Sequence, residues 1–307
     1  MLRVVINPIA GGGHSLSILD QVRAELTAHG LAHEVFTSKK KGDITALVRD
    51  AVAAGDDGVV LLGGDGTLFE AVNGLPETPY PLFIVPCGTG NDFRKTLGLP
   101  ADPIRALRAQ LDGSEALLDI CQLNGMRFIN VSGTGFDIEV LRQTEKYKPR
   151  FRGLIAYLLG LIQAIFLYRP LKATFTVDGE TFEKELTIIE IANGQYIGGG
   201  MRVAPMADPT DGKLDVVYVD KVSKPGICLL LPFFIPGWYT RLPITHALRA
   251  DSVTLSCPGM TVNVDGDLIG MDRAEYTVLK GRIIVRQAAP IRVQPLRSEP
   301  RNTVASP

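Results

Sequence analysis

Two glycine-rich segments each carry a carboxylate and have the composition of a phosphate-binding turn. They are Gly63–Thr67, with the sequence GGDGT and Asp65, and Gly88–Phe93, with the sequence GTGNDF and Asp92. Glycine lets the backbone adopt a positive φ and approach a phosphate closely, and amides at a helix N-terminus attract anions. A carboxylate among such amides stands where a Mg²⁺ ion that bridges phosphates would be bound.

A third turn of this kind strengthens the interpretation. Asn7–Gly13 has the sequence NPIAGGG and, like the other two, follows a short apolar run. One tight turn with a solvated Asp is ordinary, whereas three such turns in the first third of the chain point to a shared site. There is no GxxxxGK[ST] P-loop, and the first turn lacks the GxGxxG of dinucleotide-binding dehydrogenases. The pattern therefore predicts a phosphate site of another kind.

A carboxylate that could accept the proton of a substrate hydroxyl occurs at two Asp-Gly pairs. Phosphoryl transfer uses such a base together with charge neutralisation. Asp265 follows Val262–Val264, and Asp178 lies between two alternating runs, in the sequence DGE. Asp-Gly is also the strongest short-range signal for a β-hairpin. From the residues alone, Asp265 and Asp178 are therefore equally good candidates for the base.

A scaffold must bring the three turns together, and the first third of the chain predicts one. Short apolar runs alternate there with stretches of helical period, which predicts a parallel α/β sheet. Ligands of such sheets bind beyond the carboxyl ends of the strands, where the Gly-rich turns lie. The expected strands are Arg3–Ile6, His33–Thr37, Gly58–Leu62 and Leu82–Val85; the expected helices are Leu16–His29, Asp43–Ala54 and one that begins with Leu68–Asn73.

After about Leu123 the chain consists mainly of β-branched and alternating runs, which predict a β-rich second domain with one helical insert. We expect an α/β domain over residues 1–123 and a β-rich domain over 124–286, with residues 287–307 a candidate to return to the first. The expected strands are Arg127–Val131, Lys172–Val177, Glu185–Ala192, Leu214–Val219, Ser252–Ser256, Thr261–Val264 and Arg282–Arg286.

Two strongly apolar segments lie in the second half. Gly153–Leu167 is apolar around almost the whole helix but shorter than the ~20 residues that span a bilayer. It is either a buried helix or one that lines a lipid pocket or touches a membrane. Ile227–Tyr239 contains two prolines, so it cannot be one straight helix, and we expect a buried loop or an exposed apolar lip. Basic residues that suit anionic headgroups flank the first segment: Lys146, Lys148, Arg150, Arg152 and Arg169.

Composition narrows the classes of function. Lys and Arg number 32 against 33 Asp and Glu, so the net charge of -1 provides no general field for nucleic acid. The four Cys are far apart, which argues against a disulfide framework or a zinc ribbon and fits a reducing compartment. No secretory signal is expected, because the apolar run before Asn7 is too short. We expect a cytoplasmic protein with peripheral contact to membranes.

Together the motifs resemble the bacterial diacylglycerol kinase-like lipid kinases, a superfamily that includes sphingosine and ceramide kinases, with NAD kinase as a distant relative. Besides the three turns, the resemblance rests on Ala207–Asp215 (ADPTDGKLD) and Asp265–Asp267 (DGD). It covers essentially the whole chain. It implies two domains, an α/β nucleotide-binding domain with a parallel sheet and a β-rich, sandwich-like domain.

The resemblance also implies roles for individual residues. Asp265 would be the base, in preference to Asp178, with Asp267 beside it. Asp65 and Asp92 would organise Mg²⁺ and the phosphates. Asp119 and Lys95 would belong to a surrounding charge network. Asp211, with the carbonyls of Asp208 and Lys213, would match a structural Mg²⁺ site of some members. ATP would be held by Asn7, Pro8, Ile9, Ala10, Gly11, Thr37, Gly63, Gly64, Asp65, Gly66, Thr67, Leu68, Phe69, Glu70, Thr89 and Asn91.

Two positions depart from the family pattern. Gly12 stands where many relatives carry Lys or Arg, so a basic contact to phosphate is missing or comes from His14, Arg94 or Lys95. Asp267 replaces a Glu, so any water-mediated contact to Mg²⁺ must be rearranged.

The sequence thus predicts an ATP- and Mg²⁺-dependent lipid kinase that phosphorylates diacylglycerol or a related lipid and binds no nucleic acid. A homodimer is left open, because some relatives dimerise. The alternatives are a kinase of a soluble acceptor, as in NAD kinase, and a non-catalytic lipid- or nucleotide-binding relative.

Overall fold

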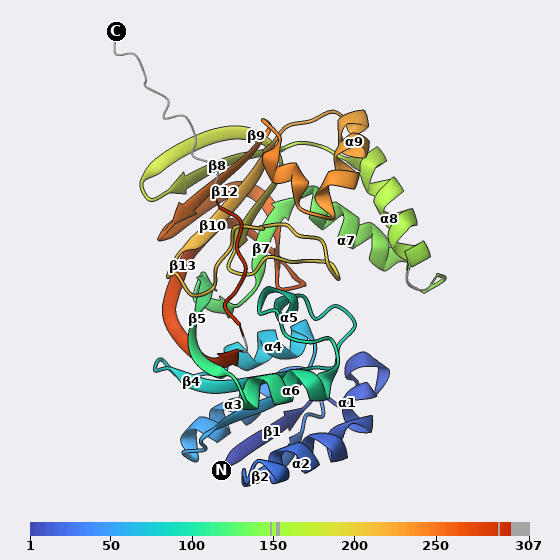
Figure 1. Ribbon diagram of the computed structural model, residues 1–307. Coiled ribbons are helices and arrows are strands. Elements are labelled where there is room, and N and C mark those ends of the chain that lie inside the picture. Colours follow the sequence, from blue (N-terminus) through green and yellow to red (C-terminus); the bar gives the residue numbers. More distant parts are fainter. Residues whose placement is uncertain (148, 152–153, 288, 296–307) are drawn as a thin grey trace.

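The structure, a computed structural model, consists of two halves stacked end to end (Figure 1). It describes residues 1–147, 149–151, 154–287 and 289–295. Lys148 and Arg152 of the basic flank, Gly153, and residues 288 and 296–307 lie outside the described residues.

The first half is a parallel sheet with the strand order β4-β3-β1-β2. Strands β1 and β3 are fully buried and β4 largely so, because helices cover both faces, as is typical of parallel sheets, whereas the edge strand β2 is partly exposed. Val4 and Leu62 face α2 and α6, whereas Val5 and Leu61 face α3 and α4. The strands are β1 (Leu2–Ile6), β2 (His33–Thr37), β3 (Gly58–Gly63) and β4 (Tyr80–Pro86), and these helices are α2 (Leu19–Ala28), α3 (Asp43–Ala53), α4 (Asp65–Val72) and α6 (Pro103–Leu111).

The helices after the Gly-rich turns begin earlier than the apolar periodicity predicts. Helix α4 begins at Asp65, three residues before Leu68, and the short helix α5 (Asp92–Thr96) begins at Asp92. Each loop carboxylate therefore occupies the first turn of a helix, where a negative charge is favourable. The helix expected over Leu16–His29 is two helices, α1 (His14–Ser17) and α2, separated at Ile18.

The second half is built from antiparallel strands. Pairings of β7 with β9, β9 with β8, β8 with β12, and β12 with β7 close a ring around buried side chains such as Phe175, Ile189 and Leu255. The strands of this half are β5 (Ser114–Leu123), β6 (Met126–Phe128), β7 (Val131–Gly135), β8 (Leu171–Val177), β9 (Glu180–Ala192), β10 (Leu214–Asp220), β11 (Thr245–Ala250), β12 (Ser252–Val264) and β13 (Asp267–Gln287).

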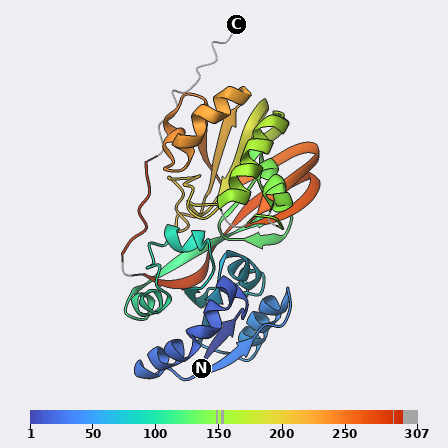
Figure 2. The ribbon, with the colours of Figure 1, turned by 90° about the vertical axis from the view of Figure 1, so that its right-hand side faces the viewer.

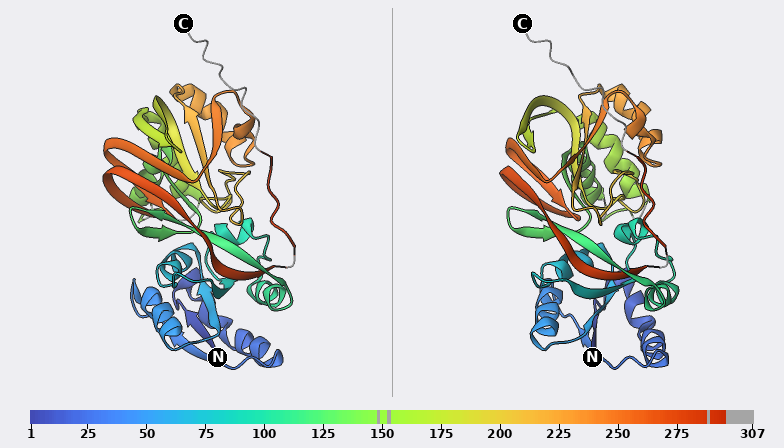
Figure 3. Two further views of the ribbon diagram at one scale, coloured as in Figure 1. Left: turned by 90° about the vertical axis from the view of Figure 1, so that its left-hand side faces the viewer. Right: turned by 60° about the vertical axis from the view of Figure 1, so that its left-hand side comes forward.

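Strand β13 joins the two halves. It pairs with β12 near its start, and Ile283 and Ile284 near its end pair with β4 of the parallel sheet (Figure 3). The sequence indicated only Arg282–Arg286 of this 21-residue strand. Residues 289–295 then run back along the second half (Figure 1), where the amide of Gln294 donates to the carbonyl of Pro205 at 2.9 Å.

Three helices and a 3-10 turn cover the outer face of the second half's sheet (Figure 2). They are α7 (Phe136–Tyr147), α8 (Leu154–Leu167), α9 (Lys224–Phe234) and the turn Trp238–Arg241. None of the helices within the described residues is long and apolar enough to cross a membrane.

For each of the two apolar segments, one expectation from the sequence is wrong. Helix α8 is not buried, since Ile155, Ile162 and Phe166 are exposed on its outer side. The segment Ile227–Tyr239 is helical as far as Phe234 and not a loop, because Pro232 lies in the last turn of α9. The expectation of an exposed apolar lip is correct, as Leu229, Phe233, Ile235 and Trp238 show.

Candidate active site

A cavity of about 340 Å³ lies where the Gly-rich turns of the first half meet the β12–β13 hairpin of the second. Ten of the residues predicted from the sequence line it, together with Lys41 and Gly88. The ten are Asn7, Ile9, Ala10, Gly64, Gly66, Thr67, Phe69, Glu70, Asp265 and Asp267.

The three turns interlock, and glycine is required where they touch. A Cβ atom on Gly88 would lie 2.5 Å from the Cα of Gly64, and one on Gly11 would lie 2.1 Å from the carbonyl oxygen of Cys87. The Asn7 side chain donates to the Thr67 hydroxyl at 3.1 Å, which ties the first turn to the second. Backbone amides of all three turns thus meet at one edge of the sheet.

The two loop carboxylates hold these turns in place. Asp65 accepts hydrogen bonds from the amides of Asp92 (2.7 Å) and Phe93 (3.4 Å), and so caps α5. Asp92 forms an ion pair with Lys95 at 2.7 Å and accepts from the amide of Gly199 at 2.8 Å. Burial and the nearby Asp92 carboxylate raise the pKa of Asp65. Each oxygen of Asp92 thus has a partner, Lys95 in the first half and Gly199 in the second, so this carboxylate connects the two halves.

Asp265 lies at the tip of the β12–β13 hairpin, in the left-handed region with φ 48°. Its carboxylate accepts from the amides of Ile129 (2.9 Å), Asn130 (3.1 Å) and Val131 (2.9 Å). These contacts explain why the strand expected over Arg127–Val131 is divided into β6 and β7. Burial raises the pKa of Asp265 to about 7, although the three amides act in the opposite direction.

Asp178 has a similar local structure and a different environment. It too has positive φ and turns a hairpin, between β8 and β9. Its exposed carboxylate accepts from the amides of Asp251 (3.0 Å) and Ser252 (2.9 Å). Of the two Asp-Gly pairs, the one at Asp265 lies on the cavity.

Lys41 is the cation of this cavity, and the sequence analysis did not single it out. Its Nζ lies 2.8 Å from Oδ2 of Asp267, across the two halves. It is the only basic side chain among the described residues that line the cavity. Glu70 positions it by accepting from the amide of Gly42 at 2.9 Å. The run of three Lys directly after β2 was the available signal, because it follows a strand end at the same sheet edge.

The other predicted ATP-site residues lie beside the cavity or away from it. Gly63, Asp65, Leu68 and Asn91 line a smaller hollow behind the loops, together with Arg94. Thr37 and Thr89 are exposed at the ends of their turns, and Pro8 and Gly11 belong to the first turn without lining the cavity.

Asp119 and Lys95 belong to separate clusters. Asp119 is buried and accepts from the amides of Gly212 and Gly281, both at 2.7 Å, which fastens the turn over Asp208–Lys213. In that turn Asp211 accepts from the amide of Lys213 and pairs with Arg249 at 3.2 Å. The Mg²⁺ site predicted here uses one carboxylate and two carbonyls and stays a prediction; within the described ranges no three His, Cys, Asp or Glu side chains are grouped to hold a metal ion. We assign no step to a metal there.

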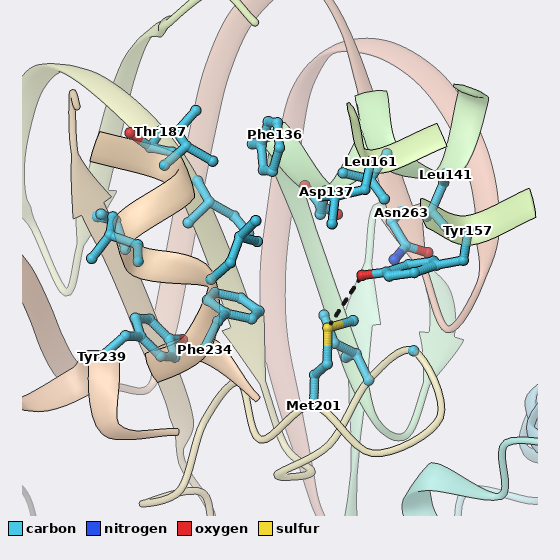
Figure 4. Close-up of a pocket in the computed structure, with 18 of the residues that line it drawn as sticks. Phe136, Asp137, Leu141, Tyr157, Leu161, Thr187, Met201, Phe234, Tyr239 and Asn263 are labelled. Atoms are coloured by element: carbon cyan, nitrogen blue, oxygen red, sulfur yellow. Dashed lines mark hydrogen bonds between the residues drawn. The ribbon is translucent and has the colours of Figure 1, made fainter. Parts of the chain in front are cut away.

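A second, apolar cavity of about 300 Å³ lies in the second half between α7, α8, α9 and β9 (Figure 4). Its lining is mainly aliphatic and aromatic, and Tyr157 donates to the sulfur of Met201 at 3.6 Å across it (Figure 4). Asn263 lines this cavity, and Asp265, two residues further along, lines the other. A two-residue step along a strand is about 7 Å. The carboxylate that lines the first cavity is therefore only two residues along the chain from Asn263, which lines the apolar one.

Family models match both halves of the chain. Residues 1–123 match the diacylglycerol kinase catalytic domain. Residues 130–286 match the YegS C-terminal NAD kinase beta sandwich-like domain.

Curated relatives and solved structures agree with these matches. A diacylglycerol kinase of Mycobacterium tuberculosis is 32% identical over 85% of this chain and 86% of its own length. One of Bacillus subtilis is 28% identical over 92% and 95%. A crystal structure of a Bacillus anthracis protein, provisionally named a diacylglycerol kinase, has a TM-score of 0.76 at 25% identity and covers 93% of this chain and 96% of that one.

Proposed function

Because the chain belongs to the diacylglycerol kinase family, we propose that it is an ATP- and Mg²⁺-dependent lipid kinase acting on the hydroxyl of diacylglycerol or a related lipid. One observation carries the proposal: Asp265 lines a cavity made of Gly-rich turns, and Asn263, two residues before it, lines a cavity between apolar helices. A phosphate donor suits the first and an acyl chain the second.

In this proposal the Gly-rich turns hold the triphosphate of ATP. Gly64, Gly66 and Gly88 line the cavity, and the N-terminus of α4 adds its positive dipole end. Lys41 supplies the cation that Gly12 does not. When bound, Mg²⁺ would neutralise charge on the phosphates, with Asp267 and Glu70 the carboxylates on the cavity wall. Asp65 and Asp92 act by holding the loops.

The reaction requires a base for the acceptor hydroxyl. Asp265 takes the proton of that hydroxyl while the hydroxyl oxygen bonds to the γ-phosphorus. The bond between this phosphorus and the β–γ bridging oxygen breaks, and ADP is released. A pKa of about 7 suits this role at neutral pH. The acyl chains would occupy the apolar cavity between α7, α8 and α9.

We further propose that the exposed apolar side chains of α8 and α9 contact a membrane surface, from which the lipid enters. The elements that line or adjoin the apolar cavity on their inner side carry exposed apolar side chains on their outer side. These are Ile162, Phe166, Leu229 and Trp238. Exposed basic residues surround them, among them Lys146, Arg150, Arg169 and Lys224. Apolar contact together with basic residues is the combination that binds anionic membranes.

The deciding experiment is phosphate transfer from labelled ATP to a panel of hydroxyl lipids in mixed micelles, with wild type and Asp265→Asn side by side. Asn tolerates the left-handed conformation at this position. We expect the variant to lose activity by about 10²- to 10⁴-fold. Near-normal turnover by Asp265→Asn would exclude this residue as the base.

The same assay separates the alternatives. Phosphorylation of a soluble acceptor without micelles would favour an NAD kinase-like activity. Binding of ATP in calorimetry without any phosphorylated product would favour a non-catalytic relative.

A further inference from the structure

Two carboxylate groups of the second half, those of Asp137 and Glu190, are buried. Asp137 lies in the first turn of α7 and lines the apolar cavity (Figure 4). Glu190 lies on β9, is 1% exposed, and extends over Gly133, where a Cβ atom would meet its Oε2 at 2.0 Å. None of the described residues donates a well-formed hydrogen bond to any of the four carboxylate oxygens.

Burying two carboxylates lowers the stability of the fold unless another group compensates for their charge. An isolated buried carboxylate normally pairs with a cation or takes up a proton. Burial raises the pKa of Asp137 to about 7 and that of Glu190 well above its usual range, and the charge of Asp137 raises the latter further. Near neutral pH the pair thus retains part of a negative charge, and Asp137 places free acceptor positions in a wall that is mainly apolar.

The position of the pair matters as much as its chemistry. The side chain of Asn263 lies close enough to Asp137 to lower its pKa, and Asn263 also accepts from the amide of Gly266 at 2.8 Å. Asn263 thus connects the acid pair to the hairpin tip that carries Asp265. Of the pair, Asp137 lines the apolar cavity, beside Asn263 and thus toward the hairpin that carries the proposed base.

We propose that Asp137, backed by Glu190, selects acceptor lipids that carry a second hydrogen-bond donor, a hydroxyl or an amino group, beside the hydroxyl that is phosphorylated. The inference rests on the proposed function, since it concerns the same acceptor site. Diacylglycerol has a single hydroxyl, and its ester oxygens would face these carboxylates as acceptors facing acceptors. A site with buried polar groups discriminates strongly against ligands that leave them unpaired.

The test compares three ligands with one ten-carbon chain: decan-1-ol, decane-1,2-diol and 2-aminodecan-1-ol. Calorimetry measures their binding to wild type, Asp137→Leu and Asp137→Asn, with Glu145→Gln, on the exposed part of α7, as the matched control. We expect Asp137→Leu to weaken binding of the diol and of the amino alcohol about tenfold or more while decan-1-ol binds as before or more tightly. The control should leave all three unchanged. Asp137→Asn keeps a polar group, so it should weaken the amino alcohol more than the diol if the site prefers a cation.

Equal changes for all three ligands in Asp137→Leu would overturn the inference, since a merely structural role affects every ligand alike. If Asp137→Leu fails to unfold cooperatively, Asp137→Asn decides through the loss of charge: a weaker affinity for the amino alcohol relative to decan-1-ol supports the inference, and an unchanged ratio overturns it. Phosphate transfer to the diol, the amino alcohol and a diacylglycerol is measured separately. Absence of any product contradicts the proposed kinase activity and leaves the binding comparison valid.

Discussion

At the scale of single residues, Lys41 has the most testable role. It is the one cation that we find on the described wall of the nucleotide cavity, where Glu70, Asp265 and Asp267 contribute negative charge. In the absence of ATP it pairs with Asp267, and the pairing raises its pKa. A triphosphate would compete for it, so Lys41 would exchange one anion for another on binding.

Replacement of Lys41 by Met should raise the KM for ATP about tenfold or more, because hydrogen bonds to charged groups contribute about 1.5–3 kcal/mol. Steady-state kinetics at fixed lipid provide the measurement. Lys40→Met is the control, since Lys40 is exposed on the same turn and does not line the cavity. Equal increases in both variants would show a general charge effect and not a contact at Lys41.

At the scale of elements, the contact between the second and third Gly-rich turns is the most constrained part of the site. Gly88→Ala should lower the free energy of unfolding by about 1–3 kcal/mol, the usual cost of overpacking, because its Cβ would meet backbone of the neighbouring turn. It should also weaken ATP binding, since the turns must separate. Chemical denaturation and calorimetry provide the two measurements.

Gly66→Ala is the matched control for stability. No atom lies within 4 Å of a Cβ placed there, and Gly66 is in the first turn of α4. Its stability should stay the same or rise by up to about 1 kcal/mol from helix propensity. A loss of stability as large as that of Gly88→Ala would mean that steric contact between the turns is not the cause.

Helices α8 and α9 provide a direct test of membrane contact. Trp238 is the only Trp of the chain and is 55% exposed next to the end of α9. Its fluorescence should shift to shorter wavelength when vesicles rich in anionic lipid are added, and shift less with zwitterionic vesicles. Phe166→Glu should reduce the shift, whereas Glu183→Gln on β9, which carries none of the proposed contact residues, should not. An unchanged spectrum with both kinds of vesicle would contradict contact at α9.

The elements also show what the sequence could and could not reveal. Local signals sufficed for β1 to β4, since β1, β3 and β4 are apolar runs and β2 is a short run around Val35 and Phe36 that ends at a polar turn. They failed for the long strand β13, whose residues are held by partners far away in the chain, and for α9, where tertiary packing tolerates Pro232 inside the last turn. In the candidate site, glycines and loop carboxylates were visible as motifs. Lys41, Asp137 and Glu190 belong to no motif, and only the fold brings them to the cavities.

At the scale of the whole molecule, several of the connections that join the halves involve the candidate site. Strand β13 pairs with both sheets, Asp92 accepts from Gly199, and Lys41 pairs with Asp267. The loop at Gly199 adjoins Gly198 and Met201, which line the apolar cavity. A change at the Gly-rich turns therefore has a short covalent and hydrogen-bonded route to the apolar cavity.

Buried carboxylates make the stability of the whole molecule depend on pH in an unusual direction. Burial raises the pKa values of Asp137 and Asp215 to about 7, from a usual value near 4, and also raises that of Glu190. A raised native pKa means that the folded state holds protons that the unfolded state has released. The contribution of these bound protons to the stability of the folded state is therefore complete below about pH 4 and is lost as the pH rises through about 7.

We accordingly expect the melting temperature to fall as the pH increases from about 5 to about 8. The exposed ion pairs that lower the pKa values of Glu25 and Asp251 do not oppose this trend, because their contribution to stability is lost only as the pH falls below the usual pKa range of these carboxyl groups.

Calorimetry from about pH 5 to about pH 8 on wild type, Glu190→Gln and the exposed Glu183→Gln provides the measurement. Gln cannot titrate, so Glu190→Gln should flatten the profile while Glu183→Gln should follow wild type. A flat or rising wild-type profile, or one that Glu190→Gln leaves unaltered, would mean that the acid pair is already compensated in the folded protein, and the donor-selecting role of Asp137 would then lose its physical basis.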